Sequence, residues 1–486
     1  MAGKNPKGAG MGTCHVAIDI GASSGRHIVG QVVDGRMELT EVYRFENGLT
    51  HKDGHLCWDI DALAENVIAG LAAAKEAGFE PQTVGIDTWA VDYVLLDESD
   101  QRLGECVGYR DARTDGVRDA LELAGILSFG EHYARTGIQY QQFNTAYQLC
   151  ALSRENREAL DTAAALLMVP DYLNFVLTGV KAQEYTNAST TALVGAESCD
   201  WDWTLIDRLN LPRRIFQPIS MPGQSLGHVK PEIVERIGFK PEVVLVASHD
   251  TGSAWLAVPA RDEQAVYFSS GTWSLVGVEN RKPICTPASA AANLTNEGGY
   301  ERRYRYLKNI MGLWMIQNVR RELGEKTGTA PTWDELVKAA EGARAAGFHA
   351  VVDADDQEFL APASMLAALR TVCERSGQPV PETMGQYALC VYDSLAADYA
   401  RTVAQLHELT GVDYTSINIV GGGSNNGYLN QATADACGLP VFAGPTEGTA
   451  LGNLMVQFIF AGEYSSLEEA RAAIKQSFEI EEYLPR

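Results

Sequence analysis

The stretch at residues 243–278 reads VVLVASHDTGSAWLAVPARDEQAVYFSSGTWSLVGV. Residues 243–247 are all aliphatic, which predicts a short strand buried on both faces. The polar segment SHDT follows this strand, and the small and apolar residues after it are typical of a helix. Asp250 is therefore expected at the carboxyl end of a strand, where open α/β sheets place their ligands. A carboxylate there is a candidate general base, although it also suits a simple helix cap.

A second feature of the same stretch is a turn rich in hydroxyl groups and glycine. The strand-like segment AVYF is interrupted by Ser269-Ser270-Gly271-Thr272 and resumes as WSLVGV. Backbone N–H groups and hydroxyls in a turn of this composition bind anions such as phosphate. The same residues suit an ordinary hairpin turn, so the segment alone leaves both interpretations open.

The N-terminal part of the chain repeats this plan. Residues 15–33, HVAIDIGASSGRHIVGQVV, read as a strand that includes Asp19, a glycine, the run SSG, and another strand. Two strand–SSG–strand units, one opening each half of the chain, indicate two related domains that face a phosphate chain between them.

The length of the chain, 486 residues, is also too great for one hydrophobic core, so two domains are expected. A segment rich in Pro and Gly, residues 218–230, precedes the second unit and indicates the approach to a boundary. We expect a first domain at residues 1–245 and a second at 246–486.

The composition narrows the classes of function. A formal net charge of −24 argues against a partner nucleic acid, whose binding depends on Lys and Arg. It leaves nucleotides possible, because backbone N–H groups and Mg²⁺ hold a triphosphate without a basic surface. The chain has no apolar run long enough for a membrane span, and its opening residues MAGKNPKGAGMG lack the apolar core of a signal peptide. With nine scattered cysteines as well, a reduced cytoplasmic protein is expected.

Further segments complete the expected architecture. Strands are predicted at residues 37–45 and 83–87, and an amphipathic helix from residue 58 to about residue 77. Aromatic and acidic residues such as Trp89 and Asp92 follow one of these strands, and this combination suits a sugar site. Each of them singly fits the core as well.

A glycine triplet marks the last motif, SINIVGGGSNN at residues 416–426. Three glycines between a strand and a helix let the backbone lie against a flat ligand or a phosphate. The motif is not a dinucleotide fingerprint, because Asn426 stands where the last glycine of G-x-G-x-x-G is needed. A dinucleotide dehydrogenase is thereby disfavoured.

Taken together, these motifs resemble those of the FGGY carbohydrate kinases, a branch of the actin/hexokinase/Hsp70 superfamily. The resemblance covers about residues 14–460. The segments that carry it, in order, are IDIGASSGR, FENGL, WDIDAL, GIDTWAVDYVLLD, YRDARTDG, PDYLNFVLTG, EYTNASTT, VASHDT, SSGTWSL, NLTNEGG, LKNIMGLW and IVGGGSNN. It implies an α/β fold with two actin/hexokinase-like (ribonuclease H-like) domains, mixed central sheets and a cleft between them. The domain at residues 1–245 would bind sugar and phosphate, and that at 246–486 would carry the base and bind nucleotide.

The resemblance also implies a role for particular residues. Asp250 would be the catalytic base, and Asp19 would face Mg²⁺ through water, with ATP as co-substrate. At one position, Ala90, the family pattern has glycine beside the sugar. The residues implied to bind ATP are Ala22, Ser23, Ser24, Gly25, Arg26, Thr272, Gln317 and Gly422, and those implied to bind the sugar are Ala90, His249, Asp250, Thr251 and Asn309.

The activity implied is ATP-dependent phosphorylation of a ketose, completed by closure of the two domains. The segments are most similar to those of family members that phosphorylate L-rhamnulose at O1. L-Fuculose, L-xylulose or another ketose is the alternative, and a chaperone-like or filament-forming ATPase is a rival of another class. The HDT segment and the GIDTW cluster favour the kinase, since such an ATPase needs no small-molecule acceptor site. We expect a monomer or a small homo-oligomer without a nucleic-acid or membrane partner.

Overall fold

The computed structural model describes residues 12–360 and 362–486 and divides into two compact units. The first unit runs to Ala257 and also contains Asn280–Arg305 and Thr449–Ser477. The second consists of Val258–Glu279, Tyr306–Gly448 and Phe478–Arg486. Both are α/β units with mixed sheets, which confirms the expected fold class. The boundary between residues 245 and 246 stays a prediction.

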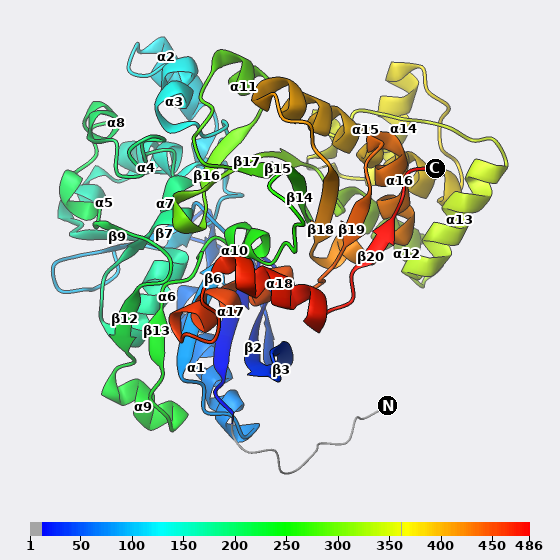
Figure 1. Cartoon of the computed structure of the whole chain (residues 1–486). Helices are drawn as coiled ribbons and strands as arrows, with labels where there is room; N and C mark the ends of the chain where they lie inside the picture. The colour runs from blue at the N-terminus through cyan, green and yellow to red at the C-terminus, as the bar shows by residue number, and fades with distance from the viewer. Residues whose placement is uncertain (1–11, 361) are drawn as a thin grey trace. The chain divides into compact units, whose positions relative to one another are not determined.

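A six-stranded mixed sheet forms the centre of the first unit (Figure 1). Its first three strands in the sequence form an antiparallel meander, and the first strand also pairs in parallel with β6, which pairs in parallel with β13. The order is β12 (Ser225–His228), β13 (Glu242–Val244), β6 (Thr83–Thr88), β1 (His15–Ile20), β2 (Ser24–Val33) and β3 (Arg36–Glu46).

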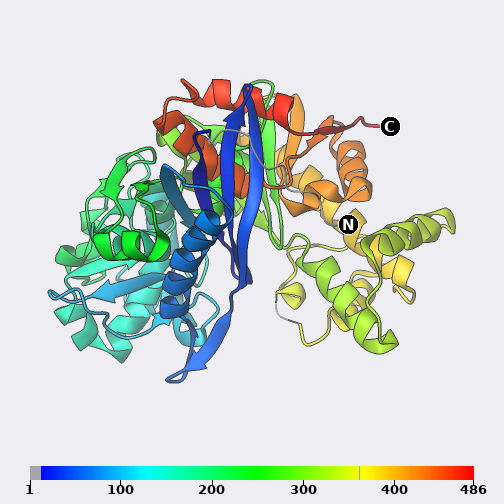
Figure 2. The same ribbon diagram turned by 90° about the horizontal axis from the view of Figure 1, so that it is seen from below.

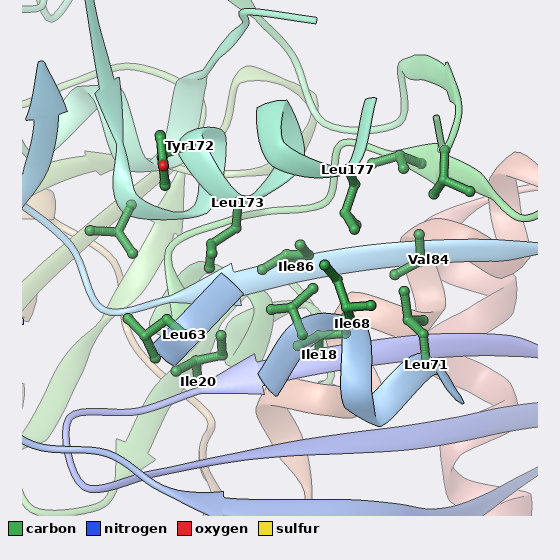
Figure 3. Close-up of a cluster of buried hydrophobic side chains, with 14 of the residues drawn as sticks. Ile18, Ile20, Leu63, Ile68, Leu71, Val84, Ile86, Tyr172, Leu173 and Leu177 are labelled. Carbon is green, nitrogen blue, oxygen red and sulfur yellow. The ribbon is translucent and has the colours of Figure 1, made fainter. Parts of the chain in front are cut away.

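The alternation of side chains along β1 and β6 decides which groups enter the core. Ile18 and Ile20 of β1 and Ile86 of β6 point to one face, where they pack with Leu63 of helix α1 and Leu173 of helix α6 (Figure 3). Because successive residues of a strand point to opposite faces, the intervening polar residues of both strands face the other way. Figure 2 shows α1 (Ile60–Glu76) alongside the long β2–β3 ribbon.

The opposite face of this sheet is covered by helix α17 (Gly448–Phe460), which returns to the first unit from late in the sequence. Gln457 donates to the backbone oxygen of Val16 (3.0 Å), and Asn453 donates to that of Gly85 (3.1 Å). Gly452 lies so close to the carbonyl of Ser253 that a Cβ would stand 1.7 Å from its oxygen. This close approach requires glycine.

The second unit repeats the strand pairing of the first, although its edge strand comes last in the sequence and not before its partner. Its strands β14 and β15 form an antiparallel pair, β14 pairs in parallel with β18, and β18 pairs in parallel with β19. A final antiparallel strand, β20, borders β19 as β12 borders β13. The duplication expected from the sequence is thus present in the topology. The run of neighbours is β17 (Tyr304–Ile310), β15 (Ser274–Asn280), β14 (Ala265–Ser270), β18 (Ser416–Val420), β19 (Val441–Ala443) and β20 (Glu481–Tyr483).

The two SSG runs, however, occupy different places in their hairpins, which corrects the expected repeat. In the first hairpin the loop covers residues 21–23, so Ser24 and Gly25 begin β2. In the second, Ser269 and Ser270 end β14 and the loop covers residues 271–273. The hairpin geometry therefore matches Gly21 with Gly271 rather than SSG with SSG.

Most predicted elements agree with the structure within a few residues. One difference is that the strand predicted at 243–247 has regular ladder pairing only over Glu242–Val244, because Leu245 already pairs with the loop residue Gln224 (2.8 Å). The nine cysteines are free thiols, and seven of them are buried. Among the described residues, no helix is both long and apolar enough to cross a membrane.

The remaining elements surround the two central sheets. In the first unit, the strands are β4 (Leu49–Lys52), β5 (His55–Trp58), β7 (Tyr93–Leu96), β8 (Cys106–Val107), β9 (Ala165–Met168), β10 (Gln183–Glu184) and β11 (Ile219–Ser220). A further strand, β16 (Thr295–Gly298), is hydrogen-bonded to β17 as the edge strand of its sheet. Its other helices are η1 (Ala112–Thr114), α2 (Val117–Leu123), α3 (Phe129–Thr136), α4 (Thr145–Glu155), α5 (Arg157–Thr162), α6 (Val169–Thr178), α7 (Tyr185–Ser189), α8 (Trp203–Arg208), η2 (Arg213–Ile215), α9 (Pro231–Ile237), α10 (Asp250–Leu256), α11 (Pro287–Ala291), η3 (Tyr300–Arg302) and α18 (Leu467–Ser477). The second unit contains α12 (Trp314–Thr327), α13 (Trp333–Ala345), η4 (Gln357–Phe359), α14 (Met365–Ser376), α15 (Met384–Thr410), η5 (Gly422–Asn425) and α16 (Gly427–Cys437).

The hairpin glycines lead to a first prediction. A Cβ at Gly25 would stand 2.1 Å from the ring of Phe45, whereas one at Gly271 would meet its nearest neighbour at 3.8 Å. Gly25→Ala should therefore destabilise the protein by about 1–3 kcal/mol through overpacking, and Gly271→Ala should change stability by less than about 1 kcal/mol. Thermal unfolding at one scan rate measures the difference. Equal midpoints for the two variants would contradict this, and adding Phe45→Leu to Gly25→Ala should restore part of the loss.

Candidate active site

Three carboxylates gather at the carboxyl ends of neighbouring strand segments in the first unit. The parallel register of β1 and β6 sets Asp19 opposite Asp87. The next segment, which follows β13, is joined to β6 by a bridge between Thr88 and His249, and Asp250 comes directly after it. Asp19 and Asp250 therefore lie in one compact unit, whereas the sequence analysis placed them in opposite domains. The physical reason is that α10 packs with the sheet of the first unit.

Asp250 has one oxygen held by the protein and one available. Oδ1 accepts a hydrogen bond from the backbone N–H of Thr251 (2.6 Å), and Nε2 of His249 lies 3.4 Å from the same atom. No hydrogen bond or ion pair from the described part of the chain reaches Oδ2, and the side chain is 31% exposed. The N-cap position belongs to His249, so Asp250 is the first helical residue and not the cap. Burial, and next the negative charge of Asp19, raise the pKa of Asp250, while His249 opposes this shift.

Asp19 and Arg26, expected to face metal and phosphate respectively, contact each other. Nε and Nη2 of Arg26 both donate to Oδ2 of Asp19, at 3.1 and 2.9 Å. The loop before Arg26 is held by Asn47, whose side chain donates to the carbonyl of Gly21 (2.8 Å) and whose N–H donates to that of Ser23 (3.0 Å). Asn47 was not singled out from the sequence.

Asp87 is a buried carboxylate that the sequence analysis did not select. Its Oδ2 accepts from Asn453 (2.6 Å), and its buried Oδ1 has no hydrogen-bond partner among the described residues. Behind Asn453, Gln457 donates to the Asn453 amide oxygen (2.7 Å) and accepts from the hydroxyl of Thr83 (2.6 Å), which also contacts His15 (2.7 Å). Burial, followed by the charge of Asp19, raises the pKa of Asp87 well above its usual value.

The residues implied to contact the sugar on either side of Asp250 lie against it. Thr251 Oγ1 is 3.0 Å from Nε2 of His249, and both side chains contact the buried guanidinium of Arg305. Their backbone is anchored by Glu184, whose buried carboxylate accepts from the N–H and the hydroxyl of Ser248, at 3.1 and 2.6 Å. Glu184 and Arg305 contact segments that are far away in the sequence, so no local pattern of residues reveals their importance.

The aromatic cluster predicted near the sugar forms around another buried carboxylate. Asp92 accepts from the indole N–H groups of Trp58 (2.6 Å) and Trp89 (3.0 Å), whose rings lie 4.1 Å apart. Burial raises the pKa of Asp92 to about 6. Ala90 is half-buried beside this cluster, and the next residue, Val91, has a φ of 68°. A β-branched residue in the left-handed region is strained, so the surrounding contacts must hold this loop rigidly.

In the second unit, three residues implied to bind nucleotide lie on adjoining elements. The carbonyl of Thr272 in the hairpin loop accepts from the N–H of Trp314 at the start of α12 (3.0 Å), and Gln317 follows one turn later. The glycine triplet packs against the other side of the hairpin, since a Cβ at Gly423 would stand 1.9 Å from Oγ of Ser270. Gly422, by contrast, faces open space.

The remaining residues implied to bind ATP or the sugar make fewer contacts that bear on such a role. Asn309 is half-buried on β17 and follows Lys308, whose ammonium pairs with Asp355 (2.9 Å). In the first hairpin, Ala22 is half-buried and Ser23 is exposed. Within residues 12–360 and 362–486, no three His, Cys, Asp or Glu side chains are arranged to hold a metal ion.

Comparison with known proteins defines the family. The N-terminal domain of the FGGY family of carbohydrate kinases matches residues 14–257, and the C-terminal domain of that family matches residues 266–461. The chain therefore belongs to the FGGY family of carbohydrate kinases. Members of this family use a sugar and ATP as substrates, generally with a divalent metal ion.

Individual named relatives indicate a narrower group within the family. Rhamnulokinase of Halalkalibacterium halodurans is 48% identical over 96% of this chain and 98% of its own length. The rhamnulokinases of Oceanobacillus iheyensis and Bacillus subtilis are 45% and 42% identical, each over 97% of this chain and over 98% and 95% of their own lengths.

Solved structures support the fold. Ligand-bound xylulose kinase from Lactobacillus acidophilus has a TM-score of 0.80 at 16% identity, with 98% of this chain and 94% of that chain covered. Plasmodium falciparum glycerol kinase has a TM-score of 0.76, also at 16% identity, with 98% and 95% covered. At this level of identity the likeness concerns the fold.

The buried Asp87 leads to a prediction about pH and stability. Its pKa is higher in the folded than in the unfolded protein, so its stabilising contribution is complete below the unfolded value and is lost as the pH rises through the folded value. Asp87→Asn keeps an oxygen for Asn453 and removes this loss. The variant should melt close to the parent at low pH and increasingly above it towards neutral pH, with lower kinase activity.

The control is Asp34→Asn, an exposed residue with φ 50° in a turn that Asn also tolerates. Its difference in melting temperature from the parent should not change with pH. A pH-independent difference for Asp87→Asn would mean that Asp87 is not a buried acid with a raised pKa.

Proposed function

We propose that this chain transfers the γ-phosphoryl group of ATP to O1 of L-rhamnulose, giving L-rhamnulose 1-phosphate and ADP in rhamnose catabolism. The observation that carries the proposal is the 42–48% identity to proteins named rhamnulokinase over about 97% of the chain. An ATP-dependent kinase of another ketose, such as L-fuculose or L-xylulose, is the alternative within the family. An actin- or Hsp70-like ATPase without a sugar substrate is disfavoured by family membership.

Asp250 is the base in this proposal. The sugar O1 attacks the γ-phosphorus while Oδ2 of Asp250 takes the O1 proton, the new O–P bond forms, and the bond to the β-phosphate oxygen breaks as ADP leaves. The proton later passes from Asp250 to solvent. A raised pKa suits this role, because proton acceptance is most effective when the pKa of the base approaches the working pH. The fixed Oδ1 keeps Oδ2 in one orientation.

The phosphates are proposed to contact the hairpin loops and neighbouring residues of both units. Loop residues 22–26 would act in the first unit, and Thr272, Gln317 and Gly422 in the second. The exposed Thr272 and the open space at Gly422 support this assignment, because neither position is filled by the protein itself. Gly25 has instead a structural explanation in its contact with Phe45.

Mg²⁺ is the divalent ion proposed, and Asp19 is the one residue proposed to face it. Asp19 offers a carboxylate next to the loop, but no cluster of three acidic or His/Cys ligands accompanies it in the described parts of the chain. This fits Mg²⁺, which is commonly held by one or two carboxylates together with water and substrate phosphates. The ion would neutralise phosphate charge. Asp19 would meet it, through water, and Arg26 would hold Asp19 in place or contact a phosphate.

The sugar is proposed to contact His249, Asp250 and Thr251 in the first unit and Asn309 in the second. Ala90 would lie beside the sugar. Because the methyl group of Ala90 occupies space there, another ketose is the alternative substrate. We further propose that the enzyme acts in the cytoplasm as a monomer or small homo-oligomer, without nucleic-acid or membrane partners. Its acidic net charge of −24 and the family's small-molecule chemistry support that assignment.

The proposal predicts the outcome of a substrate panel. With MgATP, ADP release should be fastest with L-rhamnulose, and kcat/KM should exceed that for L-fuculose, L-xylulose and L-fructose by at least about tenfold. Omission of the divalent ion should abolish the sugar-dependent rate.

The same panel on Ala90→Gly serves as the control for specificity. A single methyl group in a pocket changes discrimination by about 1–3 kcal/mol, so the ratios should shift if Ala90 contacts the sugar. L-Rhamnulose turnover no faster than the sugar-free background would overturn the assignment, and a faster rate with another ketose would establish the alternative.

A further inference from the structure

A buried charged pair lies directly behind the residues proposed to hold the sugar. The side chain of Arg305, near the start of β17, is 1% exposed. Its Nε donates to the carbonyl of Gly298 (2.9 Å), and Nη1 pairs with Oε2 of Glu297 (3.1 Å), whose side chain is 10% exposed. A guanidinium without water must have its donors satisfied by the protein. The contacts of Arg305 are therefore fixed, and they define the hydrogen-bond directions around it.

The contact with His249 determines where that imidazole carries its proton. Nη2 of Arg305 lies 3.0 Å from Nδ1 of His249. A guanidinium has donors and no acceptor, so Nδ1 must accept, and the proton of the neutral ring is on Nε2. In the opposite tautomer, the Nδ1–H of His249 would point at an N–H of Arg305. Oε2 of Glu297 is also near Nδ1, at the longer distance of 3.3 Å, and would accept from that nitrogen if Arg305 were removed.

The same arrangement sets the direction of the Thr251 hydroxyl. Oγ1 accepts from Nη1 of Arg305 (2.8 Å) and, with the proton on Nε2, from His249 (3.0 Å). Both lone pairs of the hydroxyl oxygen are then occupied. Nδ1 of His249 lies 3.4 Å from Oγ1, but its lone pair already accepts from Arg305. The hydroxyl proton is therefore left to be donated outward, beside the base Asp250. A ligand at this place must offer an oxygen that accepts a hydrogen bond.

We propose that Arg305, itself held by Glu297, is a positioning residue that keeps His249 as the Nε2–H tautomer and makes Thr251 a hydrogen-bond donor to an oxygen of the sugar. The identification of that ligand as a ketose rests on the proposed function, whereas the tautomer of His249 does not. A merely structural Arg305–Glu297 pair would affect stability and leave the tautomer and the sugar affinity independent of Arg305.

The tautomer is tested by long-range ¹H–¹⁵N correlation spectra of the ¹⁵N-histidine-labelled full chain at about pH 8, where free imidazole is neutral. The chain has nine histidines, and the signals missing from His249→Gln identify His249. The expected pattern in the sugar-free protein is Nε2–H. In Arg305→Met the pattern should change towards Nδ1–H, with Glu297 as the acceptor. An Nδ1–H pattern in the parent protein overturns the inference.

Sugar kinetics supply the second readout. Arg305→Lys keeps the charge beside Glu297, so it is the variant least affected in folding. Its single nitrogen ends one atom short of the Nη1 and Nη2 positions that donate to Thr251 and His249. Its KM for the ketose should rise roughly 10- to 100-fold, because a buried group loses its partner, while its KM for ATP stays within about twofold. The matched control is Arg303→Lys, a neighbouring buried arginine that pairs with Glu301 and Glu468, and it should leave both constants unchanged.

The outcomes separate this inference from the proposed function. An unchanged ketose KM in Arg305→Lys, with lower thermal stability, would assign the pair a structural role and overturn the inference. Absence of turnover with every ketose would overturn the proposed function, while the Nε2–H pattern and its change in Arg305→Met would still support the fixed tautomer.

Discussion

The first unit holds three carboxylates near one another at one end of its central sheet, and the contacts around them compensate their charges. The parallel register of β1 and β6 places Asp19 and Asp87 side by side, and Asp250 begins the helix that follows the next segment. Like charges repel, and burial disfavours each charge further. Each carboxylate therefore has its own means of compensation: Arg26 pairs with Asp19, Asn453 donates to Asp87, and the backbone of Thr251 donates to Asp250.

Several features of the chain follow from that requirement. Beyond its first turn, helix α17 is apolar apart from Asn453 and Gln457, which lie one turn apart and connect Asp87 with Thr83. Gly452 allows this helix to approach the start of the catalytic segment closely. The last part of the chain thus returns to the first unit to complete the environment of a carboxylate on β6. A different arrangement, the Arg305–Glu297 pair, stabilises the side chains that flank Asp250.

Much of this could be predicted from the sequence, and the limits have physical causes. The alternation of Ile18 and Ile20 with polar residues predicts β1, and the position of Asp250 after an aliphatic run predicts its place at a strand end. The offset between the two SSG runs could not be predicted, because hairpin register depends on loop geometry. Asp87, Glu184 and Arg305 carry no local signal either, since their importance arises from contacts with segments more than fifty residues away. The family resemblance supplied residue roles, but it did not indicate which groups hold those residues in place.

The most direct test of the account is single-turnover phosphoryl transfer by Asp250→Asn, compared with ATP binding and thermal stability of the same sample. Because Oδ2 of Asp250 is assigned as the base, the rate of transfer to L-rhamnulose should fall by roughly two to four orders of magnitude. ATP affinity should stay within about twofold, and the protein should melt no lower than the parent, since the substitution removes a charge that is partly buried. A variant that transfers phosphate at a near-normal rate would contradict the central claim.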